Sequence, residues 1–326
     1  MAKKAFLTGA GGFIASHLAE ALIKNNWHVT ALIHYNSRND WGWLEPLHRQ
    51  PPTNLKVLLG DITDPFLVRE AVEGSEVIFH LAALIAIPYS YQAQASYVQT
   101  NVAGTLNLAE AARQAGVSRF IHTSTSEVYG SARYTPLDEE HPLQGQSPYS
   151  ASKIGADKVI ESYVCSFSLP AVTVRPFNTY GPRQSARAVI PSIIAQALQG
   201  NAVRLGSLDT IRDLTFVSDT VAGFLRAAQA GGIDGQTINL GTGEAVSIRQ
   251  LAQTVFDLLG VSRTIITDPQ RIRPAASEVQ QLVSDNRKAK KLLDWQPIVS
   301  LPDGLSQTIE WVRQHPESFH PEEYAQ

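Results

Sequence analysis

The sequence predicts an α/β protein, a doubly wound parallel sheet with a smaller C-terminal lobe interleaved with it. Short apolar runs alternate with segments of helical periodicity over the first 180 residues, which is typical of βαβ units. A glycine-rich loop also joins the first apolar run to the first helical segment. The alternation loosens near residue 181 and returns over 214–241. We therefore expect one domain over 1–180 and 214–241, and a second lobe over 181–213 and 242–326.

Composition describes an ordinary globular chain. Its 27 basic and 30 acidic residues give a net charge of −3 without any like-charge run, so nothing indicates a nucleic-acid or acidic membrane partner. No apolar window approaches the roughly 18 residues of a membrane span, and the run after Lys3-Lys4 is too short for a signal peptide. A single cysteine, Cys165, excludes an internal disulfide and fits a reducing compartment. We expect a cytoplasmic protein.

The stretch Thr-Gly-Ala-Gly-Gly-Phe-Ile-Ala at 8–15 lies between a predicted strand over 4–8 and a predicted helix over 16–25. Glycines at this junction let the backbone approach a pyrophosphate, which also sits at the positive end of the helix. The pattern predicts a dinucleotide site of the Rossmann type that includes Gly9 and Gly12, followed by Phe13 and Ile14. The domain over 1–180 is then the dinucleotide-binding domain, and the second lobe is expected to bind substrate.

The end of the second predicted strand, Val29 to Ile33, bears on the choice of dinucleotide. An acidic residue there would bind the ribose hydroxyls of NAD, but the chain reads His34-Tyr35-Asn36-Ser37-Arg38. A positive charge at this place suits a 2′-phosphate. We therefore predict NAD(P) as cofactor and favour NADP, the alternative being that Arg38 is a solvated loop residue.

The remaining alternation predicts where polar residues meet. Because the carboxyl ends of parallel strands lie along one edge of a sheet, the residues after each strand are expected to line one crevice. His80 is predicted to be packed and hydrogen-bonded, since no His, Cys and carboxylate cluster has metal-ligand spacing. Strands are expected over 55–59, 77–80, 119–123, 172–178 and 237–240, helices over 97–116, 149–166 and 218–229, and a hairpin-like stretch over 204–213.

Tyr149 and Lys153 form a predicted acid/base pair, one helical turn apart. The lysine charge favours the phenolate, so we expect a lowered Tyr149 pKa and a base that works near neutral pH. Glu127 follows the strand over 119–123 and supplies a carboxylate for a second proton abstraction. The spacing of the pair alone also occurs on solvated helix faces, so its interpretation depends on the other motifs.

These motifs together resemble the extended short-chain dehydrogenase/reductases, the NAD-dependent epimerase/dehydratase family. Longer strings are similar to the nucleotide-sugar 4,6-dehydratases of legionaminic acid biosynthesis: Tyr-Asn-Ser at 35–37, Trp-Gly-Trp at 41–43, and the stretches 84–91, 144–153 and 177–191. The resemblance implies that GDP- or UDP-linked N-acetylglucosamine is converted to the 4-keto-6-deoxy sugar nucleotide, with a tightly bound cofactor that is recycled.

The resemblance also implies roles for single residues. Tyr149 takes the 4-hydroxyl proton as hydride leaves C4, Thr125 hydrogen-bonds O4, and Glu127 removes the C5 proton as water leaves C6. Glucose 4,6-dehydratases have an aspartic acid where this chain has Ser126, so Ser126 or Glu127 supplies the acid. The implied catalytic residues are Thr125, Ser126, Glu127, Tyr149 and Lys153. The implied cofactor contacts are Gly9, Gly12, Phe13, Ile14, His34, Asn36, Ser37, Arg38, Asp61, Ile62, Leu81, Ala82, Ala83, Thr123, Tyr149, Lys153 and Pro176. The implied substrate contacts are Ile85, Thr125, Glu127, Asn178, Arg183, Val189, Arg212 and Arg273, and no metal is expected.

Three other functions remain open. A UDP-glucuronate decarboxylase shares the Thr-Ser-Glu-Val-Tyr-Gly string at 125–130, a 4-epimerase shares the C4 oxidation, and a non-catalytic dinucleotide-sensing protein shares the fold. A homodimer is expected through the helices that begin near Tyr97 and Tyr149. Their outward faces are predicted to carry Ala109, Ala112, Val159 and Val164.

Overall fold

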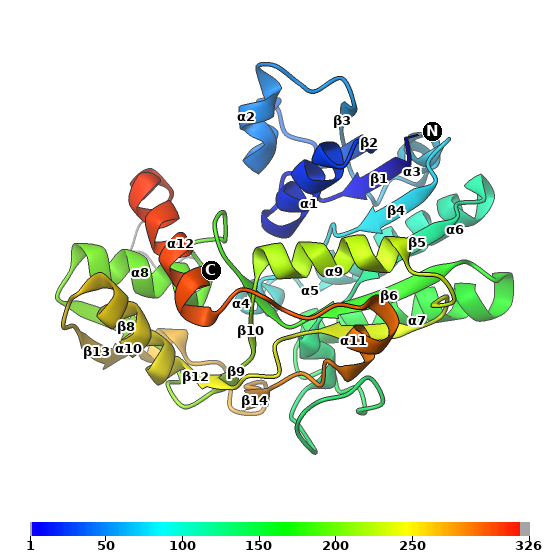
Figure 1. Ribbon diagram of the computed structural model, residues 1–326. Helices are drawn as coiled ribbons and strands as arrows, with labels where there is room; N and C mark the ends of the chain where they lie inside the picture. The colour runs from blue at the N-terminus through cyan, green and yellow to red at the C-terminus, as the bar shows by residue number, and fades with distance from the viewer. Residues whose placement is uncertain (1, 320–326) are drawn as a thin grey trace.

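The computed structural model describes residues 2–319, and a seven-stranded parallel sheet forms its centre (Figure 1). The strands run in the order β11-β6-β5-β4-β1-β2-β3, so the chain starts in the middle of the sheet and winds outward in both directions. This order confirms the predicted doubly wound fold. The strands are β1 (Lys4–Thr8), β2 (His28–His34), β3 (Leu55–Gly60), β4 (Val77–His80), β5 (Arg119–Thr123), β6 (Ala171–Pro176) and β11 (Thr237–Leu240).

Helices cover both faces of this sheet (Figure 1). One face packs on Leu18, Leu22 and Phe224 from α1 and α9, and the other on Val68, Leu108 and Ile160 from α3, α6 and α7. Ala109 and Ala112 belong to the second core, so the prediction that they face outward is wrong. The helices of the two layers are α1 (Phe13–Lys24), α3 (Pro65–Val72), α6 (Gly104–Ala115), α7 (Pro148–Phe167), α9 (Val217–Gln229) and α11 (Arg287–Leu293).

A reciprocal cap fixes the start of α7. The Ser147 hydroxyl accepts from the Ser150 N–H at 3.1 Å, and the Ser150 hydroxyl accepts from the Ser147 N–H at 3.0 Å. Pro148 occupies the first helical turn, where its missing N–H costs nothing. The first turn of α7 is therefore held in place, and that turn carries Tyr149.

The predicted helix over 97–116 is divided into three pieces. It consists of α5 (Gln94–Tyr97), a π-helix (Val98–Ala103) and α6. The buried Asn101 in the π-helix accepts from the Leu84 N–H and donates to the Leu84 carbonyl and the Ser152 hydroxyl, each at 2.9 Å. These tertiary contacts are made from within the π-helix, a wider turn than that of an α-helix and one that is frequent at functional sites. The predicted strand over 172–178 also divides, into β6 and β7 (Asn178–Tyr180).

Three small sheets lie outside the central sheet, and the helices α8, α10 and α12 lie to the left in Figure 1. The predicted hairpin over 204–213 is wrong, because β8 pairs with β13 while β9 pairs with β12 and β14. The division of the chain into two lobes at the predicted positions stays a prediction. The elements are α8 (Val189–Gln199), α10 (Ile248–Leu259), α12 (Leu301–Gln314), β8 (Ala202–Leu205), β9 (Ile211–Arg212), β10 (Leu214–Phe216), β12 (Val246–Ser247), β13 (Thr264–Thr267) and β14 (Gln281–Leu282).

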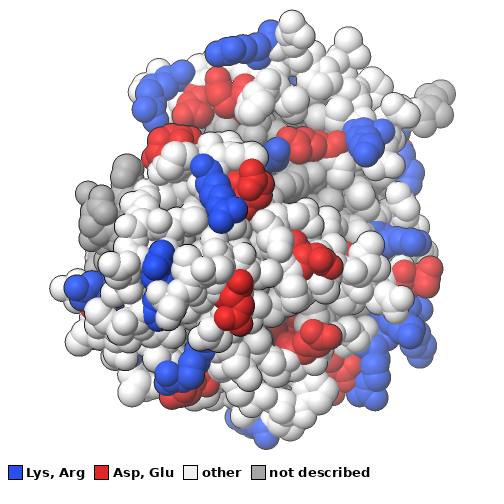
Figure 2. Space-filling model, turned by 60° about the vertical axis from the view of Figure 1, so that its left-hand side comes forward, with Lys and Arg blue, Asp and Glu red and all other residues white. Residues whose placement is uncertain are grey.

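Short helical turns complete the described chain. They are η1 (Gly42–Leu44), α2 (Glu45–His48), α4 (Ile87–Ser90), η3 (Ser126–Tyr129), η4 (Pro269–Arg271) and η5 (Pro316–Ser318). On the face that Figure 2 shows, basic and acidic side chains are interspersed without a patch of one sign. Within residues 2–319, we find no helix that is both long enough and apolar enough to cross a bilayer.

Candidate active site

Tyr149 and Lys153 are buried together at the carboxyl edge of the central sheet. They are 7% and 3% exposed, and the Lys153 ammonium donates a 2.6 Å hydrogen bond to the Thr123 carbonyl at the end of β5. The Tyr149 ring packs edge-on against Tyr97, with ring centroids 6.3 Å apart. The predicted pair is therefore a built site inside the protein, and not a solvated helix face.

The pKa of Tyr149 departs from the prediction. Burial raises it, a hydrogen bond with Thr125 works in the opposite direction, and the negative charge of Glu127 raises it further. The lowered pKa predicted from Lys153 is therefore wrong for the chain by itself, because removal of water around the phenol outweighs its hydrogen bond with Thr125. Burial also lowers the pKa of Lys153, to about 8, although Asp157 acts to raise it.

The segment after β5 brings Thr125, Ser126 and Glu127 to this pair. Thr125 caps the turn η3 by accepting from the Glu127 N–H at 3.2 Å, and Ser126 is buried. Glu127 is half-buried and its Oε1 lies 4.0 Å from Nη1 of Arg273. The predicted catalytic residues are thus close neighbours, as the motif spacing indicated.

Arg212 and Arg273, predicted from distant parts of the sequence, share a partner that sequence reasoning missed. The Glu278 carboxylate lies 3.5 Å from Arg212 and 3.7 Å from Arg273. Nη1 of Arg273 is buried and has no hydrogen-bond partner in the part of the chain that the structure describes. Glu278 follows Arg273 within one loop, but no sequence signal assigned it to the site. A group with two cations, two carboxylates and an unsatisfied N–H is suited to an incoming anion.

Loops from both halves of the chain close around Tyr149. The Tyr91 hydroxyl lies 2.6 Å from that of Ser277, and the Gln146 side chain donates to the Ala276 carbonyl at 3.0 Å. Ile87 packs against Tyr149, so the predicted substrate-facing stretch 84–91 lies at the site. Ile85 is 60% exposed in the same stretch.

The glycine loop meets the end of β4 as a dinucleotide site requires. Gly9 has a φ of +72°, and a Cβ there would lie 2.9 Å from the Ala82 backbone. The Thr8 hydroxyl accepts from the N–H groups of Leu81 and Ala82, at 3.1 and 3.0 Å. Its partner His80 is buried and bonded to Thr8 and Thr105, which confirms the prediction of a packed histidine. Sequence reasoning missed Thr8 and Thr105.

Two of the predicted cofactor contacts, His34 and Asp61, lie beside each other after β2 and β3. His34 lies 3.3 Å from Asp61, whose carboxylate also accepts from the Thr63 N–H at 2.8 Å. Arg38 is 84% exposed on its side chain and lies 3.8 Å from Asp40. Because the Arg38 side chain is mostly in solvent and lies beside a carboxylate, it does not form a preorganised site for a 2′-phosphate.

Other predicted contacts divide between the site and its surroundings. Thr123 Oγ1 and Asn178 Oδ1 are buried without a hydrogen-bond partner among residues 2–319, so both are available to a bound molecule. Arg183 instead pairs with Glu20 at 2.7 Å and donates to Ser16, both on α1. Ile62 is buried, Pro176 ends β6 and Val189 begins α8. Phe13 and Ile14 form the start of α1, and Ala83 follows Ala82. The Asn36 side chain accepts from the N–H groups of Arg38 and Asp40 in its own loop, and Ser37 in that loop is exposed.

A glycine cradle for a pyrophosphate, small residues beside it and a buried Tyr/Lys pair define an enzyme of the extended short-chain dehydrogenase/reductase class. No group of three or more His, Cys, Asp or Glu within the described residues could hold a metal ion. The family model of GDP-mannose 4,6-dehydratase matches residues 6–308. The chain therefore belongs to this family of nucleotide-sugar dehydratases and epimerases.

Individual relatives catalyse different reactions. The chain is 35% identical to a UDP-glucose 4-epimerase of Mycolicibacterium smegmatis, covering 95% of this chain and 98% of that protein. It is 32% identical to a UDP-N-acetyl-α-D-glucosaminuronate decarboxylase of Bacillus cytotoxicus, covering 96% and 99%. A dTDP-glucose 4,6-dehydratase of Streptomyces venezuelae, solved with NAD bound, superposes with a TM-score of 0.88 at 30% identity, over 98% of this chain and 100% of that one. Overall identity therefore does not choose among these reactions.

Proposed function

We propose that the chain is a nucleotide-sugar 4,6-dehydratase that acts on GDP- or UDP-N-acetylglucosamine, as in legionaminic acid biosynthesis. The observation that carries this proposal is the Glu127 carboxylate, which lies near enough to Tyr149 to raise the phenol's pKa. Oxidation at C4 requires one base, and removal of the C5 proton requires a second. A 4-epimerase has no need of that second base, whereas a decarboxylase shares the string at 125–130 and differs from a dehydratase in its product.

In the proposed reaction Tyr149 accepts the proton of the 4-hydroxyl while Thr125 orients that oxygen. Lys153 keeps a positive charge beneath the phenol, so phenolate forms more readily than burial alone permits. Glu127 then removes the C5 proton, which the neighbouring 4-ketone has made acidic, and water leaves C6. Glu127 or Ser126 donates the proton to the departing hydroxyl. A nicotinamide cofactor held by the glycine loop at 9–12 and by Leu81 and Ala82 would supply hydride acceptance from C4 and hydride return to C6, which is balanced by a proton returned to C5.

We propose NAD as the cofactor, although the sequence favoured NADP. Solved relatives of this fold contain NAD, and the exposed Arg38 lies beside Asp40. A cofactor that serves both half-reactions must stay bound between them, so we expect it to copurify. Mass analysis of the supernatant after denaturation is expected to find NAD, and NADP in its place would contradict this assignment.

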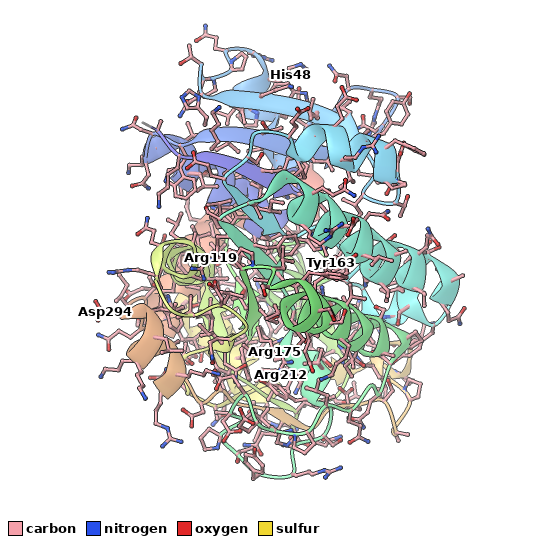
Figure 3. All side chains as sticks on the ribbon, turned by 90° about the vertical axis from the view of Figure 1, so that its right-hand side faces the viewer. His48, Arg119, Tyr163, Arg175, Arg212 and Asp294 are labelled. Atoms are coloured by element: carbon pink, nitrogen blue, oxygen red, sulfur yellow. The ribbon has the colours of Figure 1, made fainter. Side chains whose placement is uncertain are left out.

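We also propose a homodimer formed through α6 and α7. Figure 3 shows these helices side by side with Tyr163 between them, and the Tyr163 hydroxyl donates to Glu110 at 3.1 Å. Val98 and Leu106 are 56% and 44% exposed and lie in the π-helix and in α6, so they are available to a second copy. Light scattering is expected to give twice 35.6 kDa, and a monomer mass at all concentrations would overturn the proposal.

The substrate is tested with a panel of sugar nucleotides that includes GDP- and UDP-N-acetylglucosamine and UDP-glucuronate. Mass spectrometry is expected to show loss of one water from an N-acetylglucosamine nucleotide. Loss of carbon dioxide from the uronate would support the decarboxylase instead, and an isomer of unchanged mass would support the epimerase. Cofactor binding without turnover of any member would support a dinucleotide-sensing protein.

A further inference from the structure

A buried carboxylate lies one helical turn beyond Lys153, and the proposed reaction does not use it. Asp157 on α7 is 5% exposed. Its Oδ1 lies 3.0 Å from Nε2 of His122, and its Oδ2 accepts from the Ser124 hydroxyl at 2.8 Å and from Arg175 at 2.9 Å. Three partners from two adjacent strands therefore hold this carboxylate in one orientation.

Both terminal nitrogens of the arginine in this group are hydrogen-bonded as well, whereas its Nε is buried without a partner in the described chain. Nη1 of Arg175 donates to the Tyr129 hydroxyl at 3.0 Å, and its guanidinium lies 4.9 Å from the Tyr129 ring centroid. The Tyr129 hydroxyl donates onward to Asn239 at 2.7 Å. Figure 3 shows Arg175 in the interior, below α7. Buried ion pairs of this kind are often no more stabilising than apolar residues of similar size, so stability alone does not explain one here.

The charged groups around Asp157 come from four elements. Lys153 lies on the same helix, His122 on β5 and Arg175 on β6, while His80 on β4 has its ring 5.8 Å from that of His122. Burial lowers the pKa of both histidines, and for His80 the lowering is large. Burial acts to raise the pKa of Asp157, but the His122 hydrogen bond and the positive charges nearby lower it to about 2. Asp157 therefore favours the ionised form, one helical turn from Lys153, and its negative charge acts to raise the pKa of that lysine.

We propose that Asp157 is a positioning residue that sets the charge state of the Tyr149/Lys153 pair, and that His122, Ser124 and Arg175 hold it in place for this purpose. The inference rests on the proposed function in one respect, since the pair it tunes is the one assigned to C4 oxidation. Asp157 touches no reacting atom in this account. It acts through the lysine.

The sign of the effect distinguishes tuning from structural support. The negative charge of Asp157 raises the pKa of Lys153 and also that of Tyr149. Removal of this charge therefore moves both titrations, and with them the pH optimum of hydride transfer, toward acid. Simple loss of packing would reduce the rate at every pH and leave the optimum where it is.

The lysine titration is measured on the cofactor-loaded protein by NMR of ¹³C-labelled lysine side chains, with Lys153→Met used only to assign the signal. The wild-type midpoint is expected below the ordinary value for lysine, because burial lowers the pKa of Lys153. Asp157→Asn is expected to lower it by about one pH unit. Asp157→Glu retains the charge and should retain the midpoint. Glu161→Gln removes an exposed carboxylate from the same helix and should also leave it unchanged. An unmoved midpoint in Asp157→Asn would overturn the proposal.

If Asp157→Asn does not fold, the double variant Asp157→Asn/Arg175→Gln removes both members of the ion pair and leaves no unpaired charge. Comparison with Arg175→Gln alone isolates the carboxylate: the double variant is expected to have a lower midpoint than Arg175→Gln, and equal midpoints in the two would again overturn the proposal. The readout needs no sugar nucleotide. If the lysine midpoint shifts in Asp157→Asn but the protein dehydrates no sugar nucleotide, this inference is retained and the proposed function is rejected. If the midpoint does not shift but dehydration is normal, the proposed function is retained and this inference is rejected.

Discussion

The charged groups beneath the Tyr149/Lys153 pair are paired differently from those around its opening. Beneath the pair, which we call the floor, Asp157 is held by His122, Ser124 and Arg175 at 2.8 to 3.0 Å. Around the opening, which we call the rim, Glu127, Arg212, Arg273 and Glu278 approach one another at 3.5 to 4.0 Å.

This difference indicates that the floor is fixed before any ligand binds, whereas the rim is arranged to receive a ligand. In the floor, the Asp157 oxygens and both Arg175 terminal nitrogens are already hydrogen-bonded, and the atoms that lack a partner in the described chain, Nε of Arg175 and Nδ1 of His122, are buried within this packed group. The rim contains the Arg273 Nη1, which is buried without a hydrogen-bond partner in the described chain. We infer that the floor stabilises the fold and tunes the pair, and that the rim binds substrate. Changes in the two regions should therefore have different consequences.

The largest effect is expected at Tyr149, where floor and rim meet. Tyr149→Phe removes the acid/base group of the first step, so formation of reduced cofactor should slow by about 10,000-fold. A single-turnover measurement of absorbance at about 340 nm checks this with the correct sugar nucleotide. Tyr97→Phe is the matched control, because Tyr97 packs on Tyr149 and its hydroxyl donates to the Ala86 carbonyl. A comparable loss in the control would mean that packing, and not the phenol, is responsible.

Glu127→Gln is expected to stop the reaction later. It keeps size and hydrogen bonding but removes the second base, so dehydrated product should form about 1,000-fold more slowly while reduced cofactor accumulates. Absorbance and deuterium incorporation at C5 measure the two steps. Glu278→Gln changes another rim carboxylate and should cost about 10-fold or less, as expected of a group that only supports binding. Normal dehydration by the Glu127 variant would show that Glu127 is not the second base.

Arg175→Met tests the floor. It leaves the Asp157 carboxylate buried without its arginine, which should lower the free energy of unfolding by about 3 kcal/mol. Urea unfolding monitored by circular dichroism measures this change. Arg273→Gln on the rim should change stability by about 0.5 kcal/mol or less, because its partners are distant and its side chain is 28% exposed. Equal losses in both variants would erase the distinction between floor and rim.

Arg273→Gln should instead weaken ligand binding. Loss of a charged hydrogen-bond donor to a diphosphate is expected to reduce affinity by about 30-fold. Isothermal titration of the cofactor-loaded protein with UDP and with GDP gives this value and also ranks the two nucleotides. Arg249→Gln is the control in the same lobe, since Arg249 is exposed and pairs with Asp209 at 3.4 Å. Unchanged affinity in the Arg273 variant would remove this arginine from the nucleotide site.

Much of the fold and the centre of the site could be predicted from the sequence. The predicted strands over 77–80, 119–123 and 237–240 match β4, β5 and β11 residue for residue. Local signals define such elements, since an apolar run between turn residues is sufficient. The prediction that Tyr149 and Lys153 lie one turn apart also holds in the folded protein, because a helix fixes which residues share a face. Glu127 joins the pair since strand ends in a parallel sheet lie along one edge.

Only the tertiary structure decided the rest. Asp157 and Arg175 meet across a helix and a strand, and the one sequence signal was a charged residue inside the apolar run Val-Thr-Val-Arg of β6. Glu278 joins Arg212 because β14 pairs with β9, a pairing that no local pattern encodes. The pKa of Tyr149 rises where the motif predicted that it would fall, because desolvation depends on everything packed around the phenol. Residue spacing thus indicated the central candidate groups, Tyr149 and Lys153, and burial determined the direction in which their pKa values shift.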